Sequence, residues 1–489
     1  MKKKILIGCK TSWHLTDWVE SGFLEKLEKK YDLYFFFVNY KFSTDNIPKP
    51  DEYNSEIIKK KFIFPYKKSF FHKQSSNTLI RKFKTFCRLF RPKLNQLAYF
   101  LNETSELRKI HKKNKLVNAL KYDAPILRYI VSILLNLKLE KFISNLINFY
   151  LNFTVPKIVP RDEKFDLILL PYNSFNVGGY LDDLIRDAKK LNLKTFGIQQ
   201  NHDNLIERVP LMRPDYLGVW GMQTFTWCVG AHKIPPYKLS IIGSPRYDLL
   251  INFEKQNKEE SKEILNLPKD SKVLLFCPSV RTHDEEYILN EIQKNIDNKN
   301  LPENLFILYK NYELKIDDYG KKLSSKQLNG KFQNIKIWSD IKENNKKYFR
   351  NNLKNFTYLY SAAEAIISPF STMCLESLML GKPVMVYNYN TEDYGKKSEY
   401  LMKLVKHRIY QYPLLNSDAV EICDSREKIT QSINNLFEKI KNENTFSLSK
   451  QTSRQSILFN KTPTSTRIME CIDKILQNQE FDNSKEYFK

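Results

Sequence analysis

The segment Ile367–Asn388, ISPFSTMCLESLMLGKPVMVYN, places two hydroxyl side chains between an apolar run and a helical pattern. The run AIIS at residues 365–368 has the length and apolar character of a buried strand, and a Pro-Phe pair ends it. Ser371 and Thr372 follow, where hydroxyls can cap a helix or donate to a phosphate at its positive end. The segment therefore predicts a strand, a turn and a helix with an anion-binding N-terminus.

An acidic residue lies inside the same predicted helix. Glu376 follows Thr372 by one helical turn, so both share a face on which a carboxylate can accept two ribose hydroxyls. Gly381 has the position of a C-terminal helix cap, and the next apolar run begins after it. The alternative is that Ser371 only caps the helix and Glu376 is a solvated acid.

Short β-rich runs alternate with helical spacers through most of the chain, which is typical of parallel sheets wrapped by helices. The first series of predicted strands is Lys4–Cys9, Leu33–Val38, Asp166–Leu170, Thr195–Gln199 and Tyr216–Trp220, with predicted helices at Asp17–Lys30 and Tyr180–Leu191. The second series is Leu239–Gly243, Val273–Pro278, Leu305–Lys310, Ile335–Ser339, Ala365–Ser368 and Pro383–Tyr387. Two series predict an α/β protein with two Rossmann-like domains facing a cleft, at residues 1–230 and 231–489.

Composition is consistent with this division. A chain of 489 residues is too long for one ordinary core, and 42% hydrophobic with 27% charged residues is typical of globular proteins. The seven cysteines form no CxxC pair, which predicts free, mostly buried thiols and no zinc site. The apolar run Ile5–Cys9 is too short for a signal peptide, and no run of about 20 apolar residues occurs. We therefore expect a cytoplasmic protein.

The net charge of +24 is unevenly spread, since residues 67–115 hold fourteen Lys or Arg against two acids. Aromatic residues interleave with these charges, and an apolar helical pattern follows from 124 to 153. We expect a helical insertion at about 68–157 in the first domain. It fits an anionic membrane surface, with nucleic-acid binding or ordinary helix packing as alternatives. The adjoining apolar helix favours the membrane, so no nucleic-acid partner is expected.

Three segments, in this order, resemble the nucleotide-binding half of GT-B glycosyltransferases and of their relatives, the UDP-N-acetylglucosamine 2-epimerases and CDP-glycerol glycerophosphotransferases. They are LSIIGSPRYD at 239–248, VLLFCPSVRTHDEE at 273–286, and the segment around Glu376 before Gly-Lys-Pro. The first resembles the turn that opens the second domain in this superfamily. The resemblance covers roughly residues 166–395 and implies a GT-B-like fold.

The resemblance also implies residues that bind the donor's phosphates and ribose. They are Ser244, Arg246, Ser279, Arg281, Thr282, Lys310, Ser368, Ser371, Thr372 and Glu376. An arginine fork can pair with a diphosphate, although for both arginines a surface ion pair is the alternative. The chain departs from many relatives at LYKNYE, where they carry His-Pro, so Lys310 is either a phosphate contact or a solvated strand-end lysine.

Candidate bases lie in the first half of the chain, in polar loops after predicted strands. His202 and Asp203 stand in IQQNHDNL, where related sequences carry a comparable polar motif, and a His beside an Asp can deprotonate an acceptor hydroxyl. The alternative is an Asx-type turn that only satisfies backbone amides. His14, in the loop after the first strand, is the second candidate.

These observations predict a glycosyltransferase that moves a sugar from a nucleotide-activated donor to a growing surface glycan or lipid-linked acceptor. It would be peripheral on the inner membrane, and the resemblance implies neither a metal nor another cofactor. A CDP-alcohol (glycerol or ribitol) phosphotransferase or a sugar 2-epimerase is the alternative within enzymes. A non-catalytic protein that binds membrane or nucleic acid is the alternative of another class.

Overall fold

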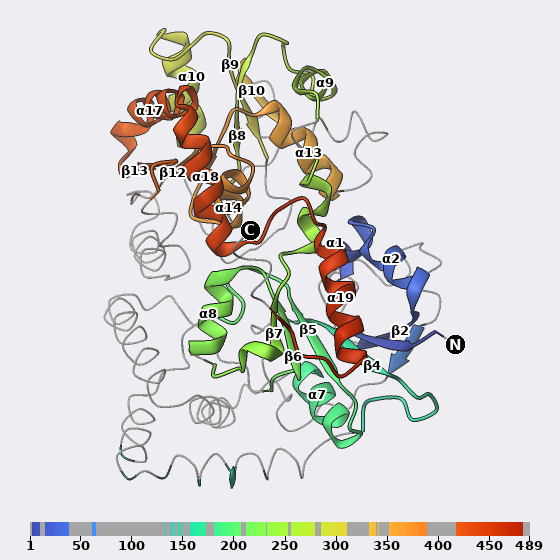
Figure 1. Cartoon of the computed structure of the whole chain (residues 1–489). Helices are drawn as coiled ribbons and strands as arrows, with labels where there is room; N and C mark the ends of the chain where they lie inside the picture. The colour runs from blue at the N-terminus through green and yellow to red at the C-terminus, as the bar shows by residue number, and fades with distance from the viewer. Residues whose placement is uncertain are drawn as a thin grey trace. The chain divides into compact units, whose positions relative to one another are not determined.

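The computed structural model describes most of the two sheets and their helices (Figure 1). The described residues are 2–9, 15–38, 61–64, single positions between 133 and 149, 157–172, 180–206, 212–230, 232–252, 256–278, 285–310, 332–338, 341, 352–387, 389 and 417–482. They form two compact units. The first ends at Asp248 and resumes at Thr462, and the second spans Leu249–Lys461.

The first unit contains a seven-stranded parallel sheet in the order β3-β2-β1-β4-β5-β6-β7. Its strands are β1 (Lys4–Cys9), β2 (Asp32–Val38), β3 (Lys61–Phe64), β4 (Leu167–Tyr172), β5 (Thr195–Gln199), β6 (Tyr216–Val219) and β7 (Leu239–Ile241). The inner strands β4 and β5 are buried at every residue, because helices can cover both faces of a parallel sheet. Strand order reverses between β1 and β4, where ligands of such sheets bind beyond the carboxyl ends.

Helices cover this sheet. They are α1 (Thr16–Glu20), α2 (Phe23–Lys30), α7 (Tyr180–Lys190), α8 (Met222–Gly230) and α19 (Thr464–Leu476), with the 3-10 helices η6 (Pro236–Lys238) and η7 (Pro245–Leu250). One core joins the start and the end of the chain, since Phe23 and Leu27 of α2 lie in the same buried cluster as Ile468 and Ile472 of α19. In Figure 1, the red helix α19 accordingly lies beside the blue helices of the N-terminus.

The second unit contains a six-stranded parallel sheet in the order β10-β9-β8-β11-β12-β13. Its strands are β8 (Lys272–Phe276), β9 (Leu305–Tyr309), β10 (Ile335–Ile337), β11 (Ala365–Ser368), β12 (Val384–Tyr387) and β13 (Val420–Cys423). This is again the Rossmann order, with the reversal between β8 and β11.

Six α-helices and a second core surround that sheet within the described residues. The elements are α9 (Lys258–Ile264), α10 (Glu285–Asp297), α13 (Asn352–Ala362), α14 (Thr372–Met379), α17 (Ile429–Lys441) and α18 (Glu443–Ser456), with η11 (Arg426–Lys428), and α9 lies against α13. Helices α10 and α17 contribute Ile288, Ile292 and Ile433 to a buried cluster with β8, β9 and β11. Each unit therefore has its own hydrophobic core.

Several boundaries differ from the sequence-based expectations. Strand β7 begins the predicted second series, yet it pairs with β6 of the first sheet, so the division expected at residue 230 falls at Asp248. The predicted domain 231–489 also loses its last helix, α19, which packs in the first core. The predicted helix Asp17–Lys30 is broken at Gly22, which adopts a φ of 73° between α1 and α2.

Two further strands, β3 and β13, were not predicted, because each is a short run at a sheet edge. The insertion expected at about 68–157 lies almost entirely outside the described residues, and so does its helical character. The cysteine prediction is confirmed where it can be followed, since Cys228, Cys277, Cys374, Cys423 and Cys471 are free and buried. None of the helices that the structure describes has the length and apolar content needed to cross a bilayer.

Candidate functional site

The carboxyl ends of β8 and β11 meet at the strand-order reversal of the second sheet. The Ser368 hydroxyl, fully buried at the end of β11, donates to the backbone carbonyl of Cys277 at 2.8 Å. Its oxygen also lies 2.9 Å from the Ser371 hydroxyl. The backbone N–H of Cys277 donates back to the Ile367 carbonyl at 2.8 Å. These bonds join the turn before α14 to the end of β8, at the edge where Rossmann-type sheets bind ligands.

Helix α14 begins at this edge as predicted. Ser371 has the extended backbone of an N-cap residue, but its side chain makes no capping hydrogen bond and lies beside Ser368 instead. The first turn of α14 carries no acidic side chain, so the partial positive charge of the helix N-terminus is not offset there. Ser371 and Thr372 are both half-buried. The structure thus brings Ser368, Ser371 and Thr372 together at a helix N-terminus suited to phosphate.

Glu376 is not the solvated acid of the alternative interpretation. It is 2% exposed, and the hydroxyl of Tyr360 donates to its Oε2 at 2.5 Å. Tyr360 belongs to α13, where its ring stacks on Phe356 one turn earlier, with ring centroids 5.9 Å apart. Sequence reasoning missed Tyr360, because an aromatic residue at helical spacing is more often part of a core than of a site.

Lys310 lies just beyond β9 at the same edge of the sheet. Its Nζ is 5.1 Å from the centroid of the Phe356 ring, and the side chain is half-buried. An ammonium over an aromatic face is a cation–π contact. Lys310 is therefore held against α13 and is not the fully solvated strand-end lysine of the alternative interpretation. Ser279, Arg281 and Thr282, predicted for the loop after β8, lie outside the described residues.

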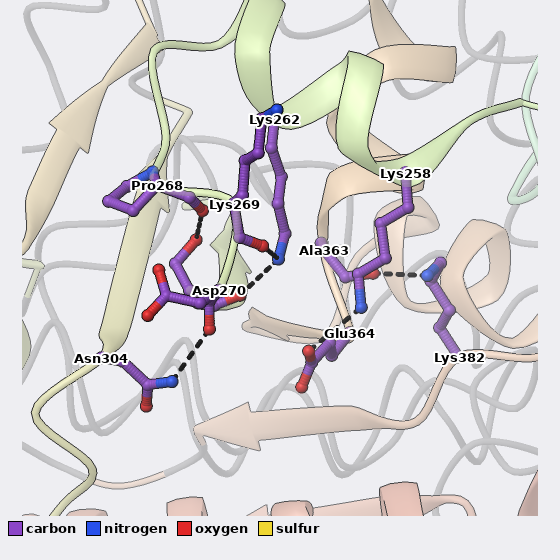
Figure 2. A network of polar contacts seen from close by, with 10 residues as sticks. Lys258, Lys262, Pro268, Lys269, Asp270, Asn304, Ala363, Glu364 and Lys382 are labelled. Atoms are coloured by element: carbon purple, nitrogen blue, oxygen red, sulfur yellow. Dashed lines mark hydrogen bonds and ion pairs between the residues drawn. The ribbon is translucent and has the colours of Figure 1, made fainter.

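A second group of charges surrounds Lys382, at the amino ends of β11 and β12 (Figure 2). Lys258 pairs with Glu364 at 3.1 Å, while the Lys382 ammonium donates to the Ala363 carbonyl. Burial and the neighbouring Lys258 lower the pKa of Lys382 to about 8. This group lies at the amino ends of β11 and β12, whereas Ser368 lies at the carboxyl end of β11. The group therefore joins α9 to the sheet and is not part of the candidate site.

The GSPRYD motif belongs to the first unit, not to the start of the second as the resemblance implies. Gly243 adopts a φ of 82°, Ser244 is buried, and Arg246 is half-buried in η7. Asp248 accepts hydrogen bonds from the backbone N–H groups of Thr464 and Ser465 at 2.7 and 3.0 Å. The aspartate of the motif therefore caps α19, a structural role that sequence reasoning did not assign.

In the first unit, the polar loop after β5 is organised by one side chain. The Gln199 amide donates to the carbonyls of Asn201 and His202 at 2.9 and 3.2 Å, and its oxygen accepts from the Trp220 backbone at 2.8 Å. The backbone N–H of Asn201 donates to the Asn204 side chain at 3.0 Å. The Asn204 side chain therefore satisfies a backbone amide of the loop, as the alternative interpretation expected.

His202 lies inside this loop and is 3% exposed. Its Nε2 donates to Gln223 at 3.1 Å, its ring stacks on Trp220, and burial lowers its pKa to about 4. The adjacent Asp203 is half-buried, with the Asn204 amide 3.3 Å from its Oδ1. His14 lies outside the described residues. Among those described, no group of three or more His, Cys, Asp or Glu could hold a metal ion.

Two Rossmann-type units in one chain define the GT-B-like class of α/β fold, as predicted. Residues 191–409, somewhat under half of the chain, match the family CDP-glycerol:poly(glycerophosphate) glycerophosphotransferase. The match confirms the expected resemblance to GT-B transferases of surface-polymer synthesis and supports an enzyme that uses a nucleotide-activated donor. No curated protein matches the sequence significantly.

Three solved structures illustrate what this chain is similar to. A variant of the wall teichoic acid polymerase TagF shares 17% identity over 64% of this chain and 74% of its own, with a TM-score of 0.42. MnaA of S. aureus with UDP shares 11% over 98% and 99%, with a TM-score of 0.48. A glycosyltransferase from Rickettsia africae shares 12% over 98% and 100%, with a TM-score of 0.43. These similarities are too weak to carry an activity to this chain.

Proposed function

We propose that this protein transfers a group from a CDP-activated alcohol, such as CDP-glycerol, to a growing surface polymer or lipid-linked acceptor. The observation that carries the proposal is the family match over residues 191–409, which includes β8, β11 and α14. The diphosphate would lie at the N-terminus of α14, near Ser371 and Thr372. Glu376 would accept the ribose hydroxyls, and Arg246, Arg281 and Lys310 are candidates to balance the phosphate charge.

Acceptor activation is assigned to the loop after β5. The base would have to take a proton from an acceptor hydroxyl. The Nε2 of His202 already carries a proton, which it donates to Gln223, and burial lowers the pKa of His202 to about 4, which makes the imidazole a weak base. Asp203 is half-buried beside it, so we place the base at Asp203 and give His202 a role in holding the loop. For Asp203→Asn we expect a fall in kcat of about 10²–10⁴ with unchanged affinity for CDP.

Ligand-induced stabilisation tests the nucleotide. A ligand at one hundred times its Kd stabilises a protein by about 2.7 kcal/mol, which raises the Tm of a domain of this size by about 5–11 °C. We expect this shift with CDP and not with GDP. If none of CDP, UDP, GDP and CMP raised the Tm, the whole transferase proposal would be contradicted.

A nucleotide sugar is the second candidate donor, because the sequence resembles GT-B glycosyltransferases as well. The two classes differ in their leaving group. Attack on the phosphorus of CDP-glycerol releases CMP, whereas attack on the anomeric carbon of a nucleotide sugar releases a nucleoside diphosphate. Chromatography of the nucleotide released in the presence of bacterial membranes therefore separates them. Release of UDP from UDP-sugars without CMP release would favour the sugar donor.

Peripheral membrane binding in the cytoplasm is also proposed, and it rests on the basic composition of residues 67–115. Apolar side chains described beyond that segment are exposed by 38% to 70%: Ile133, Leu137, Leu139, Phe142, Leu146 and Phe149. Cations would face anionic headgroups and apolar side chains the interface. Sedimentation with vesicles of phosphatidylglycerol, but not of phosphatidylcholine, is expected, and Phe142→Ser should weaken it. Equal sedimentation with both vesicles would contradict the charge argument.

A further inference from the structure

We infer that Tyr360 is a positioning residue for nucleotide binding, because it fixes the carboxylate of Glu376 from a neighbouring helix. This inference rests on the proposed function, in which Glu376 contacts the ribose. Tyr360 lies in α13, sixteen residues before Glu376, and its fully buried hydroxyl side chain donates to Oε2 at 2.5 Å. A hydrogen bond from a neutral hydroxyl to a buried carboxylate is charge-assisted and therefore strong.

The Glu376 side chain can adopt several rotamers, but a buried carboxylate is stable only in an orientation in which the protein supplies hydrogen-bond donors. At 2% exposure its carboxylate has little access to bulk water, so its orientation depends on protein donors. The Tyr360 bond engages Oε2 and so restrains the position of this oxygen. A carboxylate that accepts two vicinal hydroxyls must present its oxygens in one orientation, which a fixed donor supplies before the ligand arrives.

Tyr360 is itself held in place. Its ring stacks on Phe356 with an interplanar angle of 27°, and the other end of this stack meets the Lys310 ammonium at 5.1 Å from the Phe356 ring. Helix α13 thus contacts both a carboxylate of α14 and a cation beyond β9, two candidates for opposite ends of a nucleotide. Phe356 and Tyr360 are four residues apart, so they lie on one face of the helix.

The test compares ribose and deoxyribose. We expect the wild-type protein to bind CDP about tenfold or more tightly than 2′-deoxy-CDP by calorimetry, because a hydroxyl bonded to a charged group contributes at this level. Tyr360→Phe should reduce that ratio below about threefold while the affinity for 2′-deoxy-CDP stays as in the wild type. In a Glu376→Gln background, Tyr360→Phe should change the ratio no further, since both act through one carboxylate.

Tyr358→Phe is the matched control, because it removes a hydroxyl from a buried position two residues away on another face of α13. It should keep the wild-type ratio. Phe356→Leu, which loosens the ring stack and retains the Tyr360 hydroxyl, is the second variant and should lower the ratio less than Tyr360→Phe. A wild-type ratio in both Tyr360→Phe and Phe356→Leu would overturn the inference while CDP binding still stands. A wild-type protein that does not bind CDP would overturn the proposed function and the inference together.

Discussion

The carboxylate of Asp248 accepts a hydrogen bond from the backbone N–H of Thr464, 216 residues further along the chain, at 2.7 Å. A second bond from Ser465 completes the cap of α19, whose own N-cap residue, Pro463, has no side-chain acceptor. The last helix of the chain is thereby attached at the point where the first unit ends. The cap and the shared core explain why the chain returns to its first unit.

Removal of this cap should loosen α19 more than the rest of the molecule. For Asp248→Ala we expect a loss of about 1–2 kcal/mol, and Asp248→Asn, which retains one acceptor oxygen, should lose less. Hydrogen exchange of peptides from 462–476 measures the effect directly. Asp418→Ala, at an exposed side chain, is the control. Unchanged protection of α19 in Asp248→Ala would show that apolar packing alone holds the helix.

Gly197 in β5 should not tolerate a side chain. An added Cβ would lie 2.8 Å from Cγ of Pro214 and 3.1 Å from Cβ of Tyr172, in a strand that is buried throughout. We expect Gly197→Ala to cost about 1–3 kcal/mol in urea unfolding. Gly230→Ala, at the end of α8 with no atom within 4 Å of the new Cβ, should be neutral or stabilising. Equal stability of the two variants would contradict the close packing of β5.

Acidification should weaken the first unit through two buried histidines. Burial lowers the pKa of His202 and of His232 to about 4, and the nearby Arg213 adds to the effect at His232. Between pH 6.5 and 4 the unfolded chain therefore binds more protons than the folded one. The contribution of the two uncharged histidines to the free energy of unfolding is fully present above pH 6.5. Below pH 6.5 it decreases by up to about 1.4 kcal/mol per pH unit for each histidine.

Urea unfolding at pH 7.0, 6.0 and 5.0 measures this slope. His232→Gln removes one titrating group, so its stability should fall less steeply between pH 6.5 and 5 than that of the wild type. His202→Gln should behave in the same way. Parallel slopes in the wild type and both variants would mean that other groups set the acid sensitivity.

The loop that carries His202 and Asp203 should depend on the amide of Gln199. Gln199→Glu keeps the shape of the side chain but directs a carboxylate toward the carbonyls of Asn201 and His202, which now accept from an N–H donor. We expect a lower Tm, by several degrees, and a loss of turnover larger than the loss of CDP affinity. The cause is a buried carboxylate with one oxygen directed at carbonyls, where it has no donor. Turnover at the wild-type level would exclude this loop from the reaction.

Much of the fold was predictable because strand and helix periodicity is local. Strands β1, β5 and β11 have the bounds that the apolar runs predict, and α14 begins at Thr372 after its Ser371 cap position. The carboxyl-edge location of Ser368 and Ser371 also follows from sequence, since a residue that ends one strand of a parallel sheet lies beside those that end its neighbours. Periodicity did not show that β7 pairs with β6, because a short apolar run carries no information about which sheet it joins.

The sequence by itself determined the two series of parallel strands and the hydroxyl-rich start of α14, since both depend on residues adjacent in the chain. Only the tertiary structure decided that Asp248 caps α19, that Tyr360 donates to Glu376, and that Lys310 lies over Phe356. Each of these contacts joins residues distant in sequence, whose proximity arises when separate helices pack on the same sheet. The local pattern of apolar and polar residues does not predict which distant residues come into contact. The contact with Tyr360 is what gives Glu376 a fixed, buried carboxylate.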